Sequence, residues 1–473
     1  MSFMSNLEKS FLNTTSGDEG LHIIIVGCGK VGTTLVERLS KEGHDITIVD
    51  KRPAIIQEIT NQYDIMGVTG NGASYSVLMD AGIESADLII AVTGSDELNL
   101  LCCTVAKQVG DDCGTIARVR TPDYSKEVSY LREKLGLTLV INPELEAAIE
   151  MAHILFLPTT LEVNSFAHGH VEMIKFKISA GNVLDGMTIA KMGRELTRNV
   201  LACGIERDGE VMIPSGNTLM QAGDIATFVA ARKDIRPFLK SIGMKANKVK
   251  DAMIVGGGRA TYYLAKNLIQ MGISVKIIER DSSRCEELSV LLPKAIIING
   301  DGSDRELLNE EGLDQVESFI PLTGIDEENV MLTMLATKFS NAKVITKINR
   351  STFKDIINSL DLGSVIYPRY ITSEAIIAYV RAKGNSKNSN IETLYHLFDY
   401  RAEAIEFHVE EPSEVTDTPL MDLNLKKDLL VAFIYRNGKT TIPSGQDKIL
   451  VDDHVMIVTT HGGFDNILDI LEK

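Results

Sequence analysis

The chain has 473 residues, a length that accommodates about three or four domains of ordinary size. Hydrophobic residues make up 44% and charged residues 24%, which is the composition of a globular protein and not of a disordered one. The formal net charge of -17 argues against a nucleic-acid partner, because an acidic surface repels phosphates. No apolar run reaches the ~18 residues that a membrane-spanning helix needs.

The first twenty residues, "MSFMSNLEKSFLNTTSGDEG", are polar and lack the apolar core of a signal peptide, so we predict a mobile extension over residues 1–20 of a chain that stays in the cytoplasm. From residue 21 to about 140, β-branched runs alternate with helical stretches. The predicted strands are "HIIIVG", "DITIVD", "YDIMGVTG", "DLIIAVT", "GTIARVR" and "LTLVINP". This alternation predicts an α/β domain, a Rossmann-like parallel sheet with helices on both faces.

The first strand and helix carry the pattern G-x-G-x-x-G at Gly27, Gly29 and Gly32. The first glycine allows a tight turn, the second lets a pyrophosphate approach, and the third lets helix and strand pack closely. A helix starting near Lys30 would direct its free N–H groups at phosphates. Asp50 ends the next strand, where its carboxylate would bind ribose hydroxyls and repel a 2′-phosphate, favouring NAD over NADP. The alternative is a glycine turn kept for packing alone.

A change of pattern follows the predicted sheet. The segment "NPELEAAIEMAHILFL" predicts a connecting helix within residues 141–160, with Asn142 as its N-cap, Pro143 in its first turn and Pro158 at its end. Residues 161–240 then show short strands, turns such as "RDG" and "PSGN", and one weak helix. They predict a small β-rich α+β domain.

The second half of the chain repeats the first at a nearly constant separation. Gly27 corresponds to Gly256, 229 positions later, and Asp50 corresponds to Glu279 at the same separation. A separation held across a whole half indicates duplication. We therefore predict a second Rossmann-like domain over residues 250–370, a connecting helix and loop over 371–395 with its helix at about Ile371 to Arg381, and a second β-rich domain over 396–473.

The second glycine turn departs from the first at its third position, where Thr261 replaces glycine. A β-branched residue there is expected to push helix and strand apart. Tyr262 and Tyr263 follow at the start of the helix and are expected to crowd a ligand. Glu279 keeps the acidic role, so two interpretations stay open: a second nucleotide site, or a degenerate domain kept for structure.

Further polar positions fall where the third to fifth strands end, on the ligand side of such a sheet. Arg118 is suited to bind a phosphate through two N–H bonds, whereas Lys347 offers a point charge. The alternative for Arg118 is a surface ion pair with nearby acids. The predicted cofactor-binding residues are Gly27, Cys28, Gly29, Lys30, Val31, Gly32, Asp50, Lys51, Gly70, Asn71, Thr93, Gly94, Glu97 and Arg118, and in the second half Gly256, Gly258, Arg259, Ala260, Glu279, Asp301, Thr323 and Lys347.

The sequence shows no arrangement typical of catalysis. A dehydrogenase needs a substrate domain and an acid or base beside the nicotinamide, and each β-rich domain of ~75 residues is too small for the usual substrate cleft. His168 and His170 form the one close histidine pair, predicted to face one side of a strand, and we interpret them as a solvated strand face without a metal. The six cysteines have no C-x-x-C spacing and are expected to be reduced and buried.

Motifs along the whole chain resemble one family. They are "IIIVGCGKVG", "ITIVDK", "ADLIIAVTGSDELN" and "IARVRTPDY" in the first half, and "MIVGGGRA", "VKIIERD" and "LTGIDEENVM" in the second. From Leu21 to Lys473 the sequence resembles the TrkA family of Trk-type potassium-uptake regulatory proteins, cytosolic NAD-binding subunits built of two tandem RCK (KTN) domains. The run "ARVRTPDY" is more specific than the glycine pattern.

The resemblance implies a peripheral protein on the inner face of the membrane, one that gates a separate potassium-translocating subunit. It also implies self-association into a ring-like homo-oligomer, a tetramer, whose shape changes with bound NAD or NADH through the connecting helices. Two alternatives remain at this stage: a related RCK assembly that senses ATP or ADP, which share adenosine and phosphates with NAD, and an NAD-dependent dehydrogenase with a duplicated core.

Overall fold

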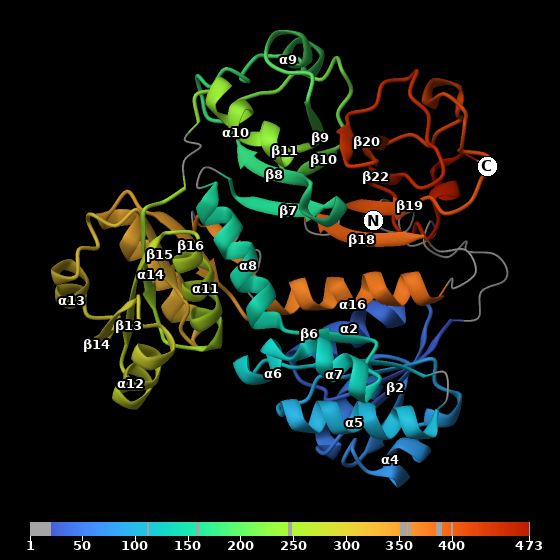
Figure 1. The fold of residues 1–473 in the computed structure, drawn as a ribbon, viewed down its shortest axis with the longest axis vertical. Helices are drawn as coiled ribbons and strands as arrows, with labels where there is room; N and C mark the ends of the chain where they lie inside the picture. Colours follow the sequence, from blue (N-terminus) through green and yellow to red (C-terminus); the bar gives the residue numbers. More distant parts are fainter. Residues whose placement is uncertain are drawn as a thin grey trace, which may run out of the picture. The chain divides into compact units, whose positions relative to one another are not determined.

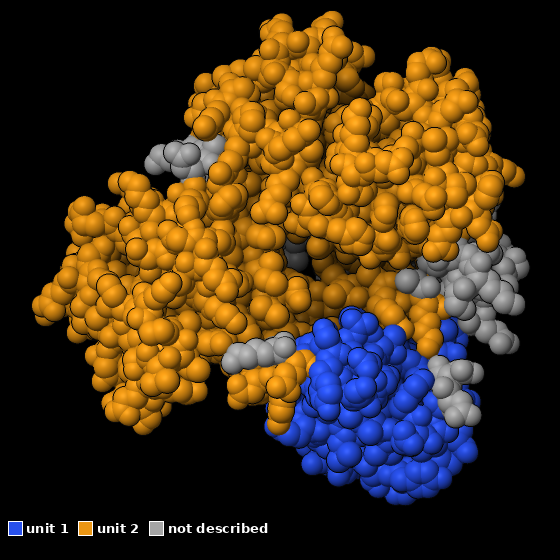
Figure 2. Space-filling model, in the orientation of Figure 1, with its two compact units in different colours: residues 1–118, 128–140 blue, residues 119–127, 141–473 orange. Residues whose placement is uncertain are grey.

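The computed structural model describes residues 20–110, 113–157, 160–244, 248–350, 357, 360, 362–384, 390–398 and 401–472. Residues 1–19 of the predicted extension, Pro158, and residues 385–389 of the predicted loop lie outside this described part. The chain divides into two compact units, coloured separately in Figure 2. Unit 1 is Met1–Arg118 with Val128–Val140, and unit 2 is Val119–Glu127 with Ile141–Lys473.

The first sheet has six strands in the order β3-β2-β1-β4-β5-β6, and the order reverses between β1 and β4. Strand β2 and helices α4 and α5 of unit 1 are drawn in shades of blue in Figure 1. All six predicted strands are present. Their bounds are β1 His22–Val26, β2 Asp45–Asp50, β3 Met66–Thr69, β4 Leu88–Ala91, β5 Gly114–Arg118 and β6 Leu139–Ile141. The pairings of β1 with β2 and β4, of β2 with β3, and of β4 with β5 are parallel. Ligands bind such sheets where the strand order reverses, at the carboxyl ends.

The helices of unit 1 are α2 Lys30–Lys41, α3 Pro53–Gln62, α4 Tyr75–Asp80, α5 Asp96–Val109 and α7 Val128–Leu135. Helix α6, Pro122–Lys126, belongs to unit 2. Helices such as α2 bury one apolar face, as amphipathic helices do. Ile23, Ile24 and Ile25 of β1 are fully buried, which is why the run reads as continuously apolar and does not alternate.

The connecting helix α8 spans Pro143–Phe156. Its predicted N-cap is confirmed, because the Asn142 side chain accepts a hydrogen bond from Leu145 N at 3.0 Å and Pro143 occupies the first turn. Within unit 2, α8 contacts α11 (Arg259–Gln270) and α16 (Pro368–Gly384). The second connecting helix α16 is thus longer than the predicted Ile371 to Arg381.

The β-rich part that follows α8 is an antiparallel sheet in the order β10-β9-β11-β8-β7. Its strands are β7 Glu162–Phe166, β8 Val171–Lys177, β9 Val200–Arg207, β10 Glu210–Met212 and β11 Ile225–Ala231. Where the sequence predicted one weak helix, the structure has α9, Ile189–Glu195, and α10, Arg232–Ser241. Pro237 lies inside α10. Because proline is unfavourable in helix interiors, the sequence of this segment does not indicate a helix clearly.

The second half repeats both sheets. The parallel order is β14-β13-β12-β15-β16-β17, and the antiparallel order is β18-β19-β22-β20-β21, which matches the first antiparallel sheet read from β7 to β10. The remaining bounds are β12 Asp251–Val255, α12 Ser282–Leu291, β13 Ser274–Glu279, β14 Ile296–Asn299, α13 Arg305–Glu310, β15 Ser318–Pro321, α14 Asp326–Phe339, β16 Lys343–Lys347, β17 Ser364–Ile366, β18 Ile391–Leu397, β19 Ala402–His408, β20 Leu429–Arg436, β21 Lys439–Thr441 and β22 His454–Thr459. The duplication inferred from the sequence is therefore a duplication of topology.

Within unit 2 the two antiparallel sheets share one apolar core. Phe166 of β7 makes edge contacts with Tyr395 of β18 and Phe433 of β20, with ring centroids 5.0 and 6.2 Å apart. The backbone N–H of Ala167 also donates to the Glu406 carboxylate at 2.9 and 3.1 Å. The two β-rich parts thus pack as a pair inside a single chain.

The predicted strand position of His168 is wrong. Strand β7 ends at Phe166 and β8 begins at Val171, and between them Ala167–Gly169 forms a short 3₁₀ turn, η2. Ala167 and His168 have φ values of 48° and 52°, in the left-handed region that residues with a Cβ rarely adopt. The turn closes a hairpin, so His168 and His170 do not share a strand face.

Candidate nucleotide sites

The first glycine turn joins β1 to α2 in unit 1. Gly27 has φ +100° and donates its N–H to Val49 O at 2.8 Å, and a Cβ there would lie 2.9 Å from the backbone of Thr93. A Cβ on Gly32 would lie 2.1 Å from Gly27 O, closer than van der Waals contact allows. By contrast, nothing lies within 4 Å of the Cβ position of Gly29, which precedes α2. The turn is closed toward the sheet and open at the N-terminus of the helix, where a phosphate can approach.

Asp50, at the end of β2, reaches back to the same turn. Its Oδ2 accepts a hydrogen bond from Cys28 N at 2.9 Å. Arg52 donates to both carboxylate oxygens, from Nε and from a terminal nitrogen, each at 2.9 Å. The Arg52 hydrogen bond lowers the pKa of Asp50 to about 2, against the opposing effect of desolvation, with further lowering by the Cys28 and Arg52 N–H groups. The carboxylate is therefore ionised at neutral pH and poised to accept bonds from hydroxyl groups.

Arg52 is a residue that sequence reasoning missed. Its side chain is 59% exposed while that of Asp50 is 9% exposed, so the guanidinium covers the carboxylate from the solvent side. A ribose that binds Asp50 must share it with Arg52 or displace this exposed side chain. The sequence contained one signal for this contact: an arginine stands two positions after the acid that ends β2.

A buried asparagine joins the ends of β4 and β5. The Asn99 side chain is fully buried and accepts hydrogen bonds from Thr93 N at 2.8 Å and Thr93 Oγ1 at 2.7 Å, and it donates to Arg118 O at 2.8 Å. The Arg118 guanidinium donates to Thr93 O. Thr93 and Arg118, both predicted site residues, are thus brought together in unit 1. The recurrence of asparagine in "TGSDELN" and "TGIDEEN" was the signal that identifies Asn99.

The second half repeats this arrangement in unit 2. Gly256 has φ +99°, and the Cβ position of Gly258 has no neighbour within 4 Å. The Glu279 carboxylate accepts the N–H of Gly257. Asn329, fully buried, accepts bonds from Thr323 N at 2.9 Å and Oγ1 at 2.8 Å and donates to Lys347 O at 3.0 Å. The open glycine, the acid and the buried asparagine of the first half therefore have positional counterparts in the second.

Thr261 fits into the second turn with a hydrogen bond of its own. The side chain is fully buried, and its hydroxyl donates to Gly256 O at 2.5 Å. Gly256 O is the counterpart of Gly27 O, the carbonyl that a Cβ on Gly32 would strike in the first half. Helix α11 still begins directly after Gly258, as α2 begins directly after Gly29. The threonine therefore keeps the glycine turn in this half.

The expectation that two tyrosines crowd the ligand is wrong. Tyr262 and Tyr263 are 4% and 6% exposed and belong to the core of unit 2. The Tyr263 hydroxyl donates to Arg120 O at 2.8 Å and accepts a bond from Asn142 Nδ2 at 3.1 Å. The helical register thus turns Tyr263 toward the cap of α8 and away from the open end of the glycine turn.

Several other predicted residues make local contacts. Asn71 Oδ1 accepts Ala73 N at 3.3 Å, Asp301 Oδ1 accepts Ser303 N at 2.8 Å, and Glu97 accepts Ser95 Oγ at 2.7 Å. Lys347 Nζ donates to Leu322 O at 3.3 Å, and a Cβ on Gly70 would lie 2.6 Å from Val77. Lys30, Lys51, Gly94 and Arg259 are exposed, and Cys28, Val31 and Ala260 are buried. Burial raises the pKa of the Cys28 thiol to about 12.

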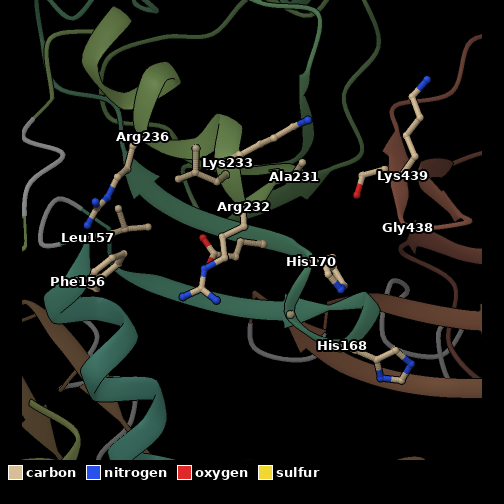
Figure 3. Close-up of a pocket in the computed structure, with 14 residues that line it drawn as sticks. Phe156, Leu157, His168, His170, Ala231, Arg232, Lys233, Arg236, Gly438 and Lys439 are labelled. Atoms are coloured by element: carbon tan, nitrogen blue, oxygen red, sulfur yellow. The ribbon is translucent and has the colours of Figure 1, made fainter. Parts of the chain in front are cut away.

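A separate pocket of about 670 Å³ lies in unit 2, between α10 and the hairpin β20–β21 (Figure 3). Arg232 pairs with Glu172 at 3.1 Å, and the Arg236 guanidinium lies 3.9 Å from the centroid of the Phe156 ring. The cationic side chains that line the pocket outnumber Glu172, the one acidic residue among them. The lining residues are Phe156, Leu157, His168, Gly169, His170, Glu172, Ala231, Arg232, Lys233, Ile235, Arg236, Gly438, Lys439 and Thr440.

Fold and sites together define a protein with two tandem Rossmann-like nucleotide-binding folds, each paired with an antiparallel β-rich domain. Comparison with known families is consistent with this class. The TrkA-N domain matches residues 23–143 and 252–368, and the TrkA-C domain matches residues 173–243 and 404–472. The chain belongs to the TrkA family, whose RCK fold is regulatory and not catalytic.

Individual relatives cover almost the whole chain. The Trk system potassium uptake protein TrkA of Haemophilus influenzae is 32% identical over 440 residues, covering 92% of this chain and 95% of the relative. The TrkA homolog of Archaeoglobus fulgidus is 31% identical over 450 residues, covering 95% and 100%. Among solved structures, the GsuK channel bound to NAD has a TM-score of 0.62 at 17% identity, covering 97% of this chain and 81% of that one, a likeness of fold.

No helix within the described residues has both the length and the apolar character needed to cross a membrane.

Proposed function

We propose that this chain is an NAD- or NADH-binding regulatory subunit that gates a membrane potassium uptake system from the cytoplasmic face. Family membership supports the regulatory role, and the relatives' names associate them with potassium uptake. The observation that carries the nucleotide assignment is the pairing, in one turn, of the open N-terminus of α2 at Gly29 with the ionised Asp50 carboxylate.

In this proposal each part of the dinucleotide meets a matching group. The pyrophosphate lies over the free N–H groups at the start of α2, and the adenosine ribose binds Asp50. Thr93, Gly94 and Arg118 form the opposite wall, at the ends of β4 and β5. The second turn, with Gly258 and Glu279, offers the same groups, and the GsuK channel with this fold has been observed with NAD.

Gating requires that the nucleotide binds two shapes of the assembly with different affinity. The connecting helices α8 and α16 are the proposed coupling elements. Helix α8 contacts α11, whose N-terminus forms the second site, and Asn142 at the cap of α8 bonds the Tyr263 hydroxyl. A shift of α11 on nucleotide binding would therefore be transmitted to α8.

The proposed assembly is a ring-like homo-oligomer, a tetramer, held against a separate potassium-translocating membrane subunit. Multi-angle light scattering of the purified chain tests the assembly and should give a mass of four chains. Co-purification with the membrane subunit tests the partnership. A monomeric chain that still regulates transport would contradict the ring.

Calorimetric titration with NAD⁺, NADH, ATP and ADP tests the ligand class. We expect NAD⁺ or NADH to bind more tightly than ATP or ADP. Tighter binding of ATP or ADP would favour the alternative, an adenine-nucleotide-sensing assembly. If none of the four nucleotides gives a heat of binding, the nucleotide proposal is overturned.

The gating role is tested by reversing the charge of Arg118. In cells that carry the membrane subunit, Arg118→Glu should abolish the nucleotide-dependent change in potassium uptake while circular dichroism shows an intact fold. Arg132→Glu, an exposed reversal on α7 of the same unit, is the matched control and should respond like the natural chain. Survival of the response in Arg118→Glu would place the site elsewhere.

A further inference from the structure

Three side chains from separate segments converge in the paired β-rich domains of unit 2. His168 comes from turn η2, Glu392 from β18 and His454 from the start of β22. One ligand atom from each lies within 4.8 Å of the other two. His168 and Glu392 are exposed and His454 is partly buried, so the group is open to solvent.

Two irregularities of the backbone direct these side chains to a common point. His168 follows Ala167 in a turn where both residues have left-handed φ values, 48° and 52°, without being glycine. Glu392 lies where the register of β18 against β19 shifts, between Ile391 and Thr393. Such bulges re-aim side chains relative to the regular pleat. Regular strands would have directed both side chains elsewhere.

The immediate surroundings position the His454 ring and the turn that carries His168. His454 Nδ1 lies 2.7 Å from Glu392 Oε2, and the His454 ring is 5.6 Å from the His168 ring, edge to face. His408, opposite His454 in the β19–β22 ladder, stacks on it at 4.8 Å. The buried Glu406 carboxylate binds Ala167 N and thereby fixes the turn that carries His168.

The geometry points to a divalent metal site of the zinc class, with His168, His454 and Glu392 as its three protein ligands and water in the fourth position. Two imidazoles and one carboxylate form a ligand set that zinc takes in open sites. Tetrahedral bonds of about 2.0–2.2 Å would bring the ligand atoms to roughly 3.5 Å from one another. Rotation of the exposed His168 and Glu392 side chains can bring the ligand atoms to this distance.

A metal at this point would connect the two halves of the duplicated chain. His168 lies between β7 and β8 of the first antiparallel sheet, whereas Glu392 and His454 lie on β18 and β22 of the second. The bound ion would hold the pair together and add to the stability of unit 2, since a ligand that binds the folded state alone stabilises it. This role is independent of nucleotide binding, so failure of either proposal leaves the other standing.

Equilibrium dialysis of the tag-free, chelator-treated full chain against Zn²⁺ alone tests the site. We expect one Zn²⁺ per chain, and at least tenfold weaker binding by His168→Gln and by His454→Gln. His461→Gln, an exposed histidine of the same β-rich domain that contacts Lys427 O, is the matched control and should bind like the natural chain. All six cysteines are buried, so exposed thiols do not compete for the ion. No zinc binding, or equal binding by both variants and the natural chain, would overturn the proposal.

A second measurement does not depend on any variant. Crystals of the natural chain soaked in Zn²⁺ should show an anomalous peak at the zinc edge between His168, Glu392 and His454. A peak elsewhere, or none, would overturn the assignment. Circular dichroism of each variant without metal checks that a loss of zinc binding does not come from unfolding.

Discussion

At the scale of single residues, the first nucleotide turn contains glycines with opposite requirements. Gly32 faces Gly27 O at a distance that leaves no space for a Cβ, whereas Gly29 faces open space. The same motif therefore contains one position set by packing and one set by access of a ligand. Substitution by alanine separates these two roles.

Gly32→Ala should destabilise unit 1 by roughly 1–3 kcal/mol, the usual cost of overpacking. The added methyl must displace the Gly27 carbonyl, which is backbone. Gly29→Ala is the matched control and should leave stability nearly unchanged while weakening NADH binding about tenfold, or ~1.4 kcal/mol. Denaturant unfolding and calorimetry measure the two effects. Equal stability of the two variants would contradict the packing argument.

Asp50 should make unit 1 sensitive to acid. Its folded-state pKa of about 2 lies below the ordinary value of 3.8, so the carboxylate stabilises the fold above about pH 4, and that contribution is lost as the pH falls through 2. Asp50→Asn should flatten the fall in unfolding free energy between pH 4 and pH 2. Glu37→Gln, which removes an exposed partner of Lys41, serves as the control. An unchanged slope in Asp50→Asn would show that its ionisation is not linked to folding.

At the scale of elements, a buried asparagine holds β4, α5 and β5 in fixed relation. Asn99 at the start of α5 bonds both strand ends at once, and Asn329 does the same in the second half. These contacts shape the wall of each proposed nucleotide site. The shape of this wall therefore depends on the side-chain amide of Asn99 in the first half and of Asn329 in the second.

Asn99→Ala should destabilise unit 1 by about 1–3 kcal/mol, because Thr93 N and Arg118 O lose their buried partner. We also expect weaker NADH binding, since Thr93 and Arg118 are no longer held together. Hydrogen exchange should place the loss in unit 1 alone, and Asn329→Ala should place it in unit 2 alone. Spread of either effect across both units would contradict the assignment of each asparagine to the proposed site of its own half.

The junction of α8 and α11 is the second feature at this scale. Tyr263→Phe removes a hydroxyl that bonds Arg120 O and Asn142 Nδ2. We expect a loss of about 1–2 kcal/mol in unfolding free energy, unchanged NADH affinity at the first site, and a smaller nucleotide effect on potassium uptake. Tyr262→Phe, on the same helix, is the control. A full uptake response in Tyr263→Phe would remove α11 from the coupling route.

At the scale of the whole molecule, duplication gives one chain two proposed nucleotide sites of similar geometry and unequal composition. Lys347 replaces Arg118 and Thr261 replaces Gly32, while the open glycine, the acid and the asparagine recur. A lysine offers one point charge where arginine offers a planar pair of donors. The second site should therefore be the weaker one.

Titration with NADH should accordingly resolve two events per chain. Gly29→Ala should weaken the tighter event and Gly258→Ala the weaker event, each about tenfold. Both substitutions fall where a Cβ meets no neighbour, so stability serves as an internal control. A single event that Gly258→Ala leaves untouched would indicate that the second half is structural.

The sequence alone determined the two Rossmann-like sheets, the duplication, the glycine turns, the acid at the end of β2 and the cap of α8. These features depend on local periodicity and on residues close together in the chain, which the sequence displays directly. The TrkA family could be inferred from the same motifs.

Only the tertiary structure decided which side chains meet at and around the proposed sites. It turned Tyr263 toward Asn142, 121 positions away, placed Arg52 over Asp50, accommodated Thr261 through its hydroxyl, and brought His168 to Glu392 and His454. The first and last of these contacts join the two halves of the chain. They depend on helix register, a bulge and a left-handed turn, and none of these leaves a periodic signal, because packing between separate segments decides them.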